Sequence, residues 1–212
     1  MGGRATEIVL VHGLWFGAWA LAPLGRRLGA DGTPVRRISY PCTRDTLEAH
    51  AHRLHAFARE NEATTRHFVG HSLGGLVILR MFSLFGDVEP GRIVLLGSPL
   101  RGSRVARKAD RLPGSSALTG KMGPELKEGY DRCPPGREIG MIAGSKDIGL
   151  GRLVGGVGAA GDGTVALDET RAPWLTAHRV LPVSHTGLVL SKEVARQASR
   201  FLQTGAFDAH GP

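Results

Sequence analysis

A serine flanked by glycines at the junction of two apolar segments constrains the fold of this chain most strongly. Residues 70–75 read Gly-His-Ser-Leu-Gly-Gly, which places Ser72 in the pattern Gly-x-Ser-x-Gly. The stretch 65–69 before it is compatible with a short buried strand, and the stretch 73–85 after it predicts a buried helix that ends before Gly86. Glycine on both sides of Ser72 allows a tight strand–turn–helix connection that projects the serine side chain. Because the chain contains 31 glycines, the pattern alone is weak, and the rest of the sequence has to support it.

Strand-like and helix-like segments alternate along the whole chain. We expect strands at 8–11, 35–40, 65–69, 92–96, 138–143 and 179–183. We expect helices at 18–28, 46–62, 73–85 and 192–202. This alternation, without internal repeats, predicts a single α/β domain over residues 1–212, in which a mostly parallel sheet of about six strands has helices on both faces. Open sheets of this kind bind ligands beyond the carboxyl ends of their strands.

A serine hydroxyl becomes a nucleophile when a histidine accepts its proton and a carboxylate orients that histidine. His185 follows the expected strand 179–183 and lies in a turn before the last helix, at the same edge of the sheet as Ser72. His178 precedes that strand, and His210 lies in the terminal tail. We therefore expect His185 to be the base.

Two aspartates compete for the role of the orienting acid. Asp147 and Asp162 both follow the expected strand 138–143, so their order in the chain does not separate them. Asp162 lies between two glycines, which allow a tight turn that presents its carboxylate. We expect Asp162 to be the acid, and Asp147 is the alternative. The other interpretation of Asp147 is a solvated turn residue beside Lys146.

The expected strand 8–11 runs directly into a His-Gly pair at positions 12 and 13. A backbone N–H after such a strand, together with the N–H after the serine, can stabilise the oxyanion that forms when serine attacks a carbonyl carbon. We assign these two donors to Leu14 and Leu73, with Trp15 as the second choice for the first of them. Trp15 and Phe16 are candidates for substrate contacts beside this loop.

The longest segment between two expected strands is 101–137, which we interpret as a lid or cap over Ser72 because loops of this length are usually functional. Four of its apolar residues would form a wall against an acyl chain: Leu112, Leu118, Met122 and Leu126. The alternative is that these residues pack the loop onto the domain.

Composition excludes several classes of protein. No run reaches the roughly 18–20 apolar residues of a membrane span, and residues 1–7 lack the apolar core of a signal peptide. Cys42 and Cys133 are too few for a disulfide framework or a zinc cluster, which favours free thiols and a cytoplasmic location. His52 and His55 share a helical face without a further ligand at matching spacing, so we expect a solvated face and no metal or organic cofactor.

The net charge of +8 comes mostly from arginine and is dispersed, with one denser stretch at 101–111. Such a stretch can dock to an anionic lipid surface or to nucleic acid. No nucleic-acid-binding motif accompanies it, so a solvated loop is the favoured interpretation and we expect no nucleic-acid partner.

Several motifs together resemble the bacterial lipase and esterase branch of the α/β-hydrolase superfamily, most closely its small triacylglycerol-lipase-like and inositol-deacylase-like members. They are the His-Gly pair at 12–13 and the segments 70–75, 97–103, 162–165 and 184–187. The resemblance covers nearly the whole chain and implies an α/β-hydrolase fold with Ser72, Asp162 and His185 as a catalytic triad. It also supports Asp162, because lipases of this type carry their acid in an Asp-Gly-x-Val turn.

These observations predict a hydrolase of carboxylic esters that works through an acyl-enzyme intermediate without a cofactor. The small cap favours short or medium acyl chains. The same residues would also serve an acyltransferase or a thioesterase, and the fold can act as a non-catalytic binding module. The presence of all three triad residue types favours an enzyme that acts on a small ester, including a lipid ester.

Overall fold

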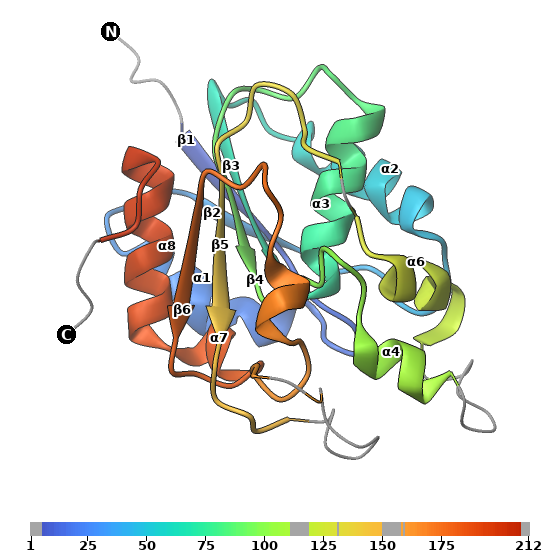
Figure 1. Ribbon diagram of the computed structural model, residues 1–212. Coiled ribbons are helices and arrows are strands. Elements are labelled where there is room, and N and C mark those ends of the chain that lie inside the picture. Colours follow the sequence, from blue (N-terminus) through green and yellow to red (C-terminus); the bar gives the residue numbers. More distant parts are fainter. Residues whose placement is uncertain (1–5, 111–118, 131, 150–157, 159, 209–212) are drawn as a thin grey trace, which may run out of the picture.

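Six parallel strands form one sheet at the centre of the computed structural model (Figure 1), which describes residues 6–110, 119–130, 132–149, 158 and 160–208. Every neighbouring pair in the sheet is parallel. The order across the sheet is β2 (Val35–Ile38), β1 (Thr6–Val11), β3 (Thr65–His71), β4 (Ile93–Leu96), β5 (Ile139–Gly144) and β6 (Ala177–Leu181). Since β2 and β3 lie on opposite sides of β1, the order of the strands reverses between β1 and β3, where open sheets bind their ligands.

Helices cover both faces of the sheet (Figure 1). The helices α1 (Ala22–Leu28), α7 (Gly187–Leu190) and α8 (Lys192–Thr204) pack on one face, and α2 (Leu47–Ala58) and α3 (Leu73–Leu84) pack on the other. The short helices α4 (Arg104–Ala109) and α6 (Gly123–Glu128) lie between β4 and β5 in the chain. Three 3-10 turns complete the described elements: η1 (Ala18–Leu21), η2 (Gly120–Met122) and η4 (Leu167–Thr170).

The two-residue repeat of the strands divides the core into two layers. In β1, Val9 and Val11 pack toward α2 and α3, whereas Ile8 and Leu10 pack toward α1 and α8. All four side chains are buried, which explains why β1 is apolar without interruption from Ile8 to Val11.

The sequence predicts all six strands and the four long helices, with shifts at their ends. Residues 18–28 form η1 followed by α1 rather than one helix, because Pro23 in the first turn of α1 has no N–H to donate to the preceding turn. The strand expected at 35–40 ends at Ile38, since the N–H of Tyr40 donates to the ring of His12 instead of to a neighbouring strand.

The expected cap segment 101–137 contains α4, η2 and α6. Leu112 and Leu118 lie outside the described residues. Met122 does not form part of an acyl-binding wall but is fully buried in the core beneath the segment, whereas Leu126 lines the cavity at Ser72. Within the part of the chain that is described, no helix is long and apolar enough to cross a membrane.

Candidate active site

Ser72 lies in a strained turn between β3 and α3. Its φ of 53° and ψ of −120° belong to a backbone region that residues with a side chain rarely adopt. The glycines around it permit this turn: a Cβ on Gly70 would lie 2.6 Å from the backbone nitrogen of Gly75, and one on Gly74 would lie 2.2 Å from the carbonyl oxygen of Val11. The turn holds the partly exposed side chain of Ser72 at the carboxyl end of β3, as the sequence predicts.

His185 and Asp162 meet at the same edge of the sheet. Nδ1 of His185 lies 2.7 Å from Oδ2 of Asp162, and the backbone N–H of His185 donates to the carbonyl oxygen of Asp162 at 2.9 Å. Both side chains are buried, with exposed fractions of 7% and 1% for the two residues. Because the carboxylate occupies Nδ1, the other ring nitrogen, Nε2, is the atom with which His185 can accept a proton.

The carboxylate of Asp162 is held in its ionised form. Its Oδ1 accepts hydrogen bonds from the N–H groups of Thr164 at 2.9 Å and Val165 at 2.8 Å. Burial opposes ionisation, but the charge of His185 and these hydrogen bonds outweigh it, so the pKa of Asp162 lies below its usual value. The glycine-flanked turn therefore positions a charged acceptor for the ring of His185.

The other candidates for the acid and the base take no part in the contact between His185 and Asp162. Asp147 is exposed, and no hydrogen-bond or ion-pair partner for it exists among the described residues. His178 binds the hydroxyl of Thr170 through Nε2 at 2.8 Å. His210 lies outside the described part of the chain.

Ser72 and His185 line one cavity of about 270 Å³. No hydrogen bond joins their side chains in this structure, and such contacts are often long in free enzymes and shorten when substrate binds. The described lining is mostly apolar and contains no Lys, Arg, Asp or Glu side chain; it comprises Leu14, Trp15, Phe16, His71, Ser72, Pro99, Ser103, Val105, Ala106, Ala109, Thr119, Leu126, Gly149, Thr164, Val165, His185 and Thr186.

The loop after β1 provides a candidate oxyanion donor. The N–H of Trp15 is engaged, because it donates to Sγ of Cys42 at 3.3 Å. The N–H of Leu14 has no acceptor among the described residues, and Leu14 lines the cavity. Of the two donors considered from the sequence, Leu14 is therefore the one whose N–H is available. The N–H of Leu73 lies in the first turn of α3, where backbone N–H groups have no partner within the helix.

A buried histidine and tyrosine, which sequence reasoning missed, fix the orientation of this loop. Nδ1 of His12 donates to the carbonyl oxygen of Gly13 at 2.8 Å, while its Nε2 accepts the N–H of Tyr40 at 3.2 Å. The hydroxyl of Tyr40 donates to the carbonyl oxygen of His12 at 2.6 Å, and the two rings stack. In a trans peptide the C=O and N–H point in opposite directions, so holding the Gly13 carbonyl directs the N–H of Leu14 away from His12.

The cap helix α4 forms one wall of the cavity through Val105, Ala106 and Ala109. Its first turn is fixed to the segment that follows Asp162. Nη1 and Nη2 of Arg104 each donate to a carboxylate oxygen of Asp168 at 2.6 Å, and the backbone N–H of Arg104 donates to Oε1 of Glu169 at 2.6 Å. Arg104, one of the basic residues of the stretch 101–111, is therefore paired with a carboxylate of the same domain.

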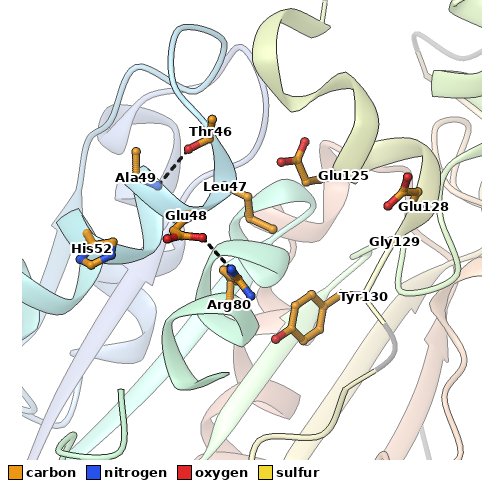
Figure 2. Close-up of a pocket in the computed structure, with 10 residues that line it drawn as sticks. All are labelled: Thr46, Leu47, Glu48, Ala49, His52, Arg80, Glu125, Glu128, Gly129 and Tyr130. Atoms are coloured by element: carbon orange, nitrogen blue, oxygen red, sulfur yellow. Dashed lines mark hydrogen bonds and ion pairs between the residues drawn. The ribbon is translucent and has the colours of Figure 1, made fainter. Parts of the chain in front are cut away.

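A second cavity, of about 670 Å³, lies between α2, α3 and α6 (Figure 2). The dashed lines in Figure 2 mark two contacts at this cavity. Nη2 of Arg80 lies 2.7 Å from Oε2 of Glu48, and the hydroxyl oxygen of Thr46 accepts the N–H of Ala49 at 3.2 Å. The described lining contains no Ser or Cys, and its Thr46 hydroxyl caps α2 while the ring of His52 packs on Phe85. The smaller cavity at Ser72 is therefore the better candidate for an active site, despite the larger volume of the second one.

The histidines of α2 have structural contacts. His55 binds Asp87 through Nε2 at 2.9 Å and stacks on the ring of Phe85, and His52 contacts the same ring edge to face. Among the described residues, no group of three or more His, Cys, Asp or Glu side chains is arranged to hold a metal ion.

Comparisons with known proteins agree with this architecture. Residues 8–207 match the model of the alpha/beta hydrolase family. No match was found among curated proteins.

Among solved structures, the mature form of the lipase BlEst2 from Bacillus licheniformis is 17% identical, with a TM-score of 0.73 over 97% of this chain and 94% of that one. A metagenomic carboxyl esterase is 16% identical, with a TM-score of 0.69 over 97% of this chain and 76% of that one. A pyrethroid hydrolase from Sphingobium faniae is 16% identical, with a TM-score of 0.61 over 94% of this chain and 98% of that one. At these identities the likeness shows the fold, and together with the family match over nearly all of the sequence it establishes that the chain belongs to the α/β-hydrolase family.

Proposed function

We propose that this chain is a serine hydrolase of carboxylic esters, in which Ser72 is the nucleophile, His185 the base and Asp162 the orienting acid. One observation carries the proposal: a histidine whose Nδ1 lies 2.7 Å from a buried carboxylate shares an apolar cavity with a serine held in a strained turn. This combination of nucleophile, base and acid is that of acyl transfer through serine.

The reaction follows from these roles. Nε2 of His185 accepts the proton of the Ser72 hydroxyl while its oxygen attacks the ester carbonyl carbon. Asp162 keeps the hydrogen of His185 on Nδ1 and stabilises the charged ring that forms. The ring then donates its proton to the departing alcohol, which leaves an acyl group on Ser72. Water, activated by His185 in the same way, releases the acid and restores the free serine.

Two backbone N–H groups would hold the developing oxyanion, those of Leu14 and Leu73. Fixed donors of this kind are worth about 2.7–4 kcal/mol each in transition-state stabilisation. The structure supports Leu14 over Trp15 because the N–H of Trp15 is already bonded to Cys42. Trp15 and Phe16 line the cavity and are candidates for contacts with the substrate.

The cavity favours an uncharged, short or medium acyl group. Its volume of about 270 Å³ lies just below the usual range for ligand sites, roughly 300–1,000 Å³. A charged group placed in such an apolar lining would lose its hydration without gaining a partner. The names of structural neighbours, among them a lipase, a carboxyl esterase and a pyrethroid hydrolase, support a hydrolase that acts on esters.

A panel of p-nitrophenyl esters tests this function. We expect the purified chain to hydrolyse the acetate and butyrate faster than the palmitate, and Ser72→Ala to abolish the activity while the protein stays folded by circular dichroism. Parallel reactions with an added alcohol or with an acyl thioester distinguish an acyltransferase or a thioesterase that uses the same triad. No turnover of any of these substrates would contradict the proposal and favour a non-catalytic binding module.

A cytoplasmic location is a further part of the proposal. It is supported by Cys42 and Cys133, which are both free thiols in the structure. Fractionation of the source cells tests it, and recovery of the chain outside the cytoplasm would contradict it.

A further inference from the structure

One buried titratable residue at the site has no part in the reaction described above. His71 is the last residue of β3, directly before Ser72, and only 1% of it is exposed. Its ring lies 4.7 Å from the ring of His185 between centroids, and its Nε2 lies 3.1 Å from the carbonyl oxygen of His185. A carbonyl oxygen only accepts hydrogen bonds, so Nε2 of His71 carries the hydrogen in this contact.

This hydrogen bond joins the turn that carries Ser72 to the turn that carries His185, and the mechanism requires a fixed distance between these two residues. Asp162 holds His185 from one side through the ring and the backbone N–H. His71 holds the carbonyl group of the same residue from the side of the nucleophile. A base must lie within about 2.6–3.2 Å of the atom whose proton it takes, and an error of about 1 Å can cost a hundredfold in rate.

We infer that His71 is a positioning residue, which sets the distance between the base and the nucleophile by donating a hydrogen bond from Nε2 to the carbonyl oxygen of His185. The inference rests on the proposed function for its effect on catalysis. The contact itself belongs to the fold and can be measured without a substrate.

The surroundings of His71 suit a neutral ring in this role. Burial, and next the nearby His185, lower the pKa of His71 to about 3, so its ring stays uncharged when His185 takes up a proton. The ring also packs edge to face against Phe16 and contacts the loop of Gly13, where an added Cβ would lie 3.1 Å from Nδ1 of His71. Displacing the ring would therefore disturb both sides of the cavity.

Three variants separate positioning from a merely structural role. His71→Leu keeps an apolar volume in the core but removes the donor, whereas His71→Gln places an amide N–H at about the distance of Nε2. His67→Leu is the matched control, because His67 is a second buried histidine of β3 that binds a backbone group, the N–H of Arg92, at the opposite end of the strand.

We expect His71→Leu to lower kcat for p-nitrophenyl butyrate by about 10–100-fold with KM within threefold of the wild type. We expect His71→Gln to restore kcat to within about fivefold, and His67→Leu to match the wild type. A kcat for His71→Leu within threefold of the wild type would overturn the inference. So would equal losses in folded His71→Leu and His71→Gln, or the same loss in His67→Leu.

A measurement on the wild-type chain covers the cases in which a variant does not fold or esters are not turned over. Nitrogen-15 NMR of the histidine rings reports which nitrogen of His71 carries the hydrogen. We expect Nε2–H, with a hydrogen bond to the backbone of His185 and with His185 protonated at Nδ1 beside Asp162. Hydrogen on Nδ1 of His71 would overturn the inference even in an active enzyme. An inert enzyme with Nε2–H would overturn the proposed function and leave the positioning contact intact.

Discussion

Replacing Asp162 by asparagine tests the link between the acid and the base with almost no change in shape. In the wild type, Oδ1 accepts two backbone N–H groups, from Thr164 and Val165, and Oδ2 accepts Nδ1–H of His185. Asparagine has one oxygen and one NH₂ group for these two positions. Turning the NH₂ toward the two N–H groups would leave each donor unpaired, at a cost of about 1–3 kcal/mol per group.

The asparagine oxygen is therefore expected at the Oδ1 position, with its NH₂ facing Nδ1 of His185. That arrangement forces the hydrogen of His185 onto Nε2, and a ring in this tautomer has no lone pair for the proton of Ser72. We expect Asp162→Asn to lower kcat by roughly a thousandfold to ten-thousandfold, which corresponds to about 4–5.5 kcal/mol at 1.36 kcal/mol per tenfold change in rate.

Steady-state hydrolysis of p-nitrophenyl butyrate measures this loss, with thermal melts to show that the variants remain folded. Asp147→Asn is the matched control, because Asp147 is an exposed aspartate downstream of the same strand. We expect its kcat within twofold of the wild type. An activity of Asp162→Asn within tenfold of the wild type, or a loss of thousandfold in Asp147→Asn, would refute the reasoning.

Three further predictions follow from the packing around the site. Tyr40→Phe removes the hydroxyl that donates to the carbonyl of His12. We expect a loss of about 1–3 kcal/mol in the free energy of unfolding and a kcat reduced several-fold. An unchanged melting temperature with full activity would contradict the role of Tyr40 in fixing the loop after β1. Ala109→Leu adds a bulkier side chain to the cavity wall. We expect the rate of octanoate hydrolysis relative to that of butyrate to fall by about tenfold or more. An unchanged ratio of these rates would exclude α4 from the acyl site. Burial lowers the pKa of five histidines: that of His12, those of His50, His67 and His178 to about 4, and that of His71 to about 3. In the unfolded chain these histidines bind protons below about pH 6.5, whereas in the folded chain they stay neutral. The melting temperature should therefore decrease as the pH is lowered from about 6.5 to about 4. A melting temperature that stays constant from pH 7 to pH 5 would contradict neutral histidine rings in the fold.

Local patterns predict the sheet and most of the candidate site. The runs that form β1 and β4 are short, mostly apolar and bounded by polar residues or glycines, so their limits are visible in the sequence. In β3 the apolar pair Phe68 and Val69 lies directly before the Gly-x-Ser-x-Gly pattern. Ser72 is visible because a strained turn requires glycines beside it, and Asp162 because glycines flank it on both sides. The order of nucleophile, acid and base along the chain then points to His185.

Contacts between segments far apart in the chain were not predictable in this way. Tyr40 and His12 are 28 residues apart, and neither belongs to a pattern that would indicate a hydrogen bond between them. The pairing of Arg104 with Asp168 spans 64 residues and depends on where α4 lies after folding. The burial of Met122 likewise depends on how its segment packs, because a methionine suits an acyl-binding wall and a core equally well.

Covalent labelling of the active-site serine tests the central claim most directly, namely that His185 and Asp162 make the hydroxyl of Ser72 a nucleophile. The folded chain is treated with a fluorophosphonate, and the adduct is located by peptide mass spectrometry. We predict one adduct per chain, on Ser72, with parallel loss of ester hydrolysis, and no adduct in Ser72→Ala or His185→Ala. A folded wild-type chain that takes up no label, or label that persists in Ser72→Ala, would contradict the account.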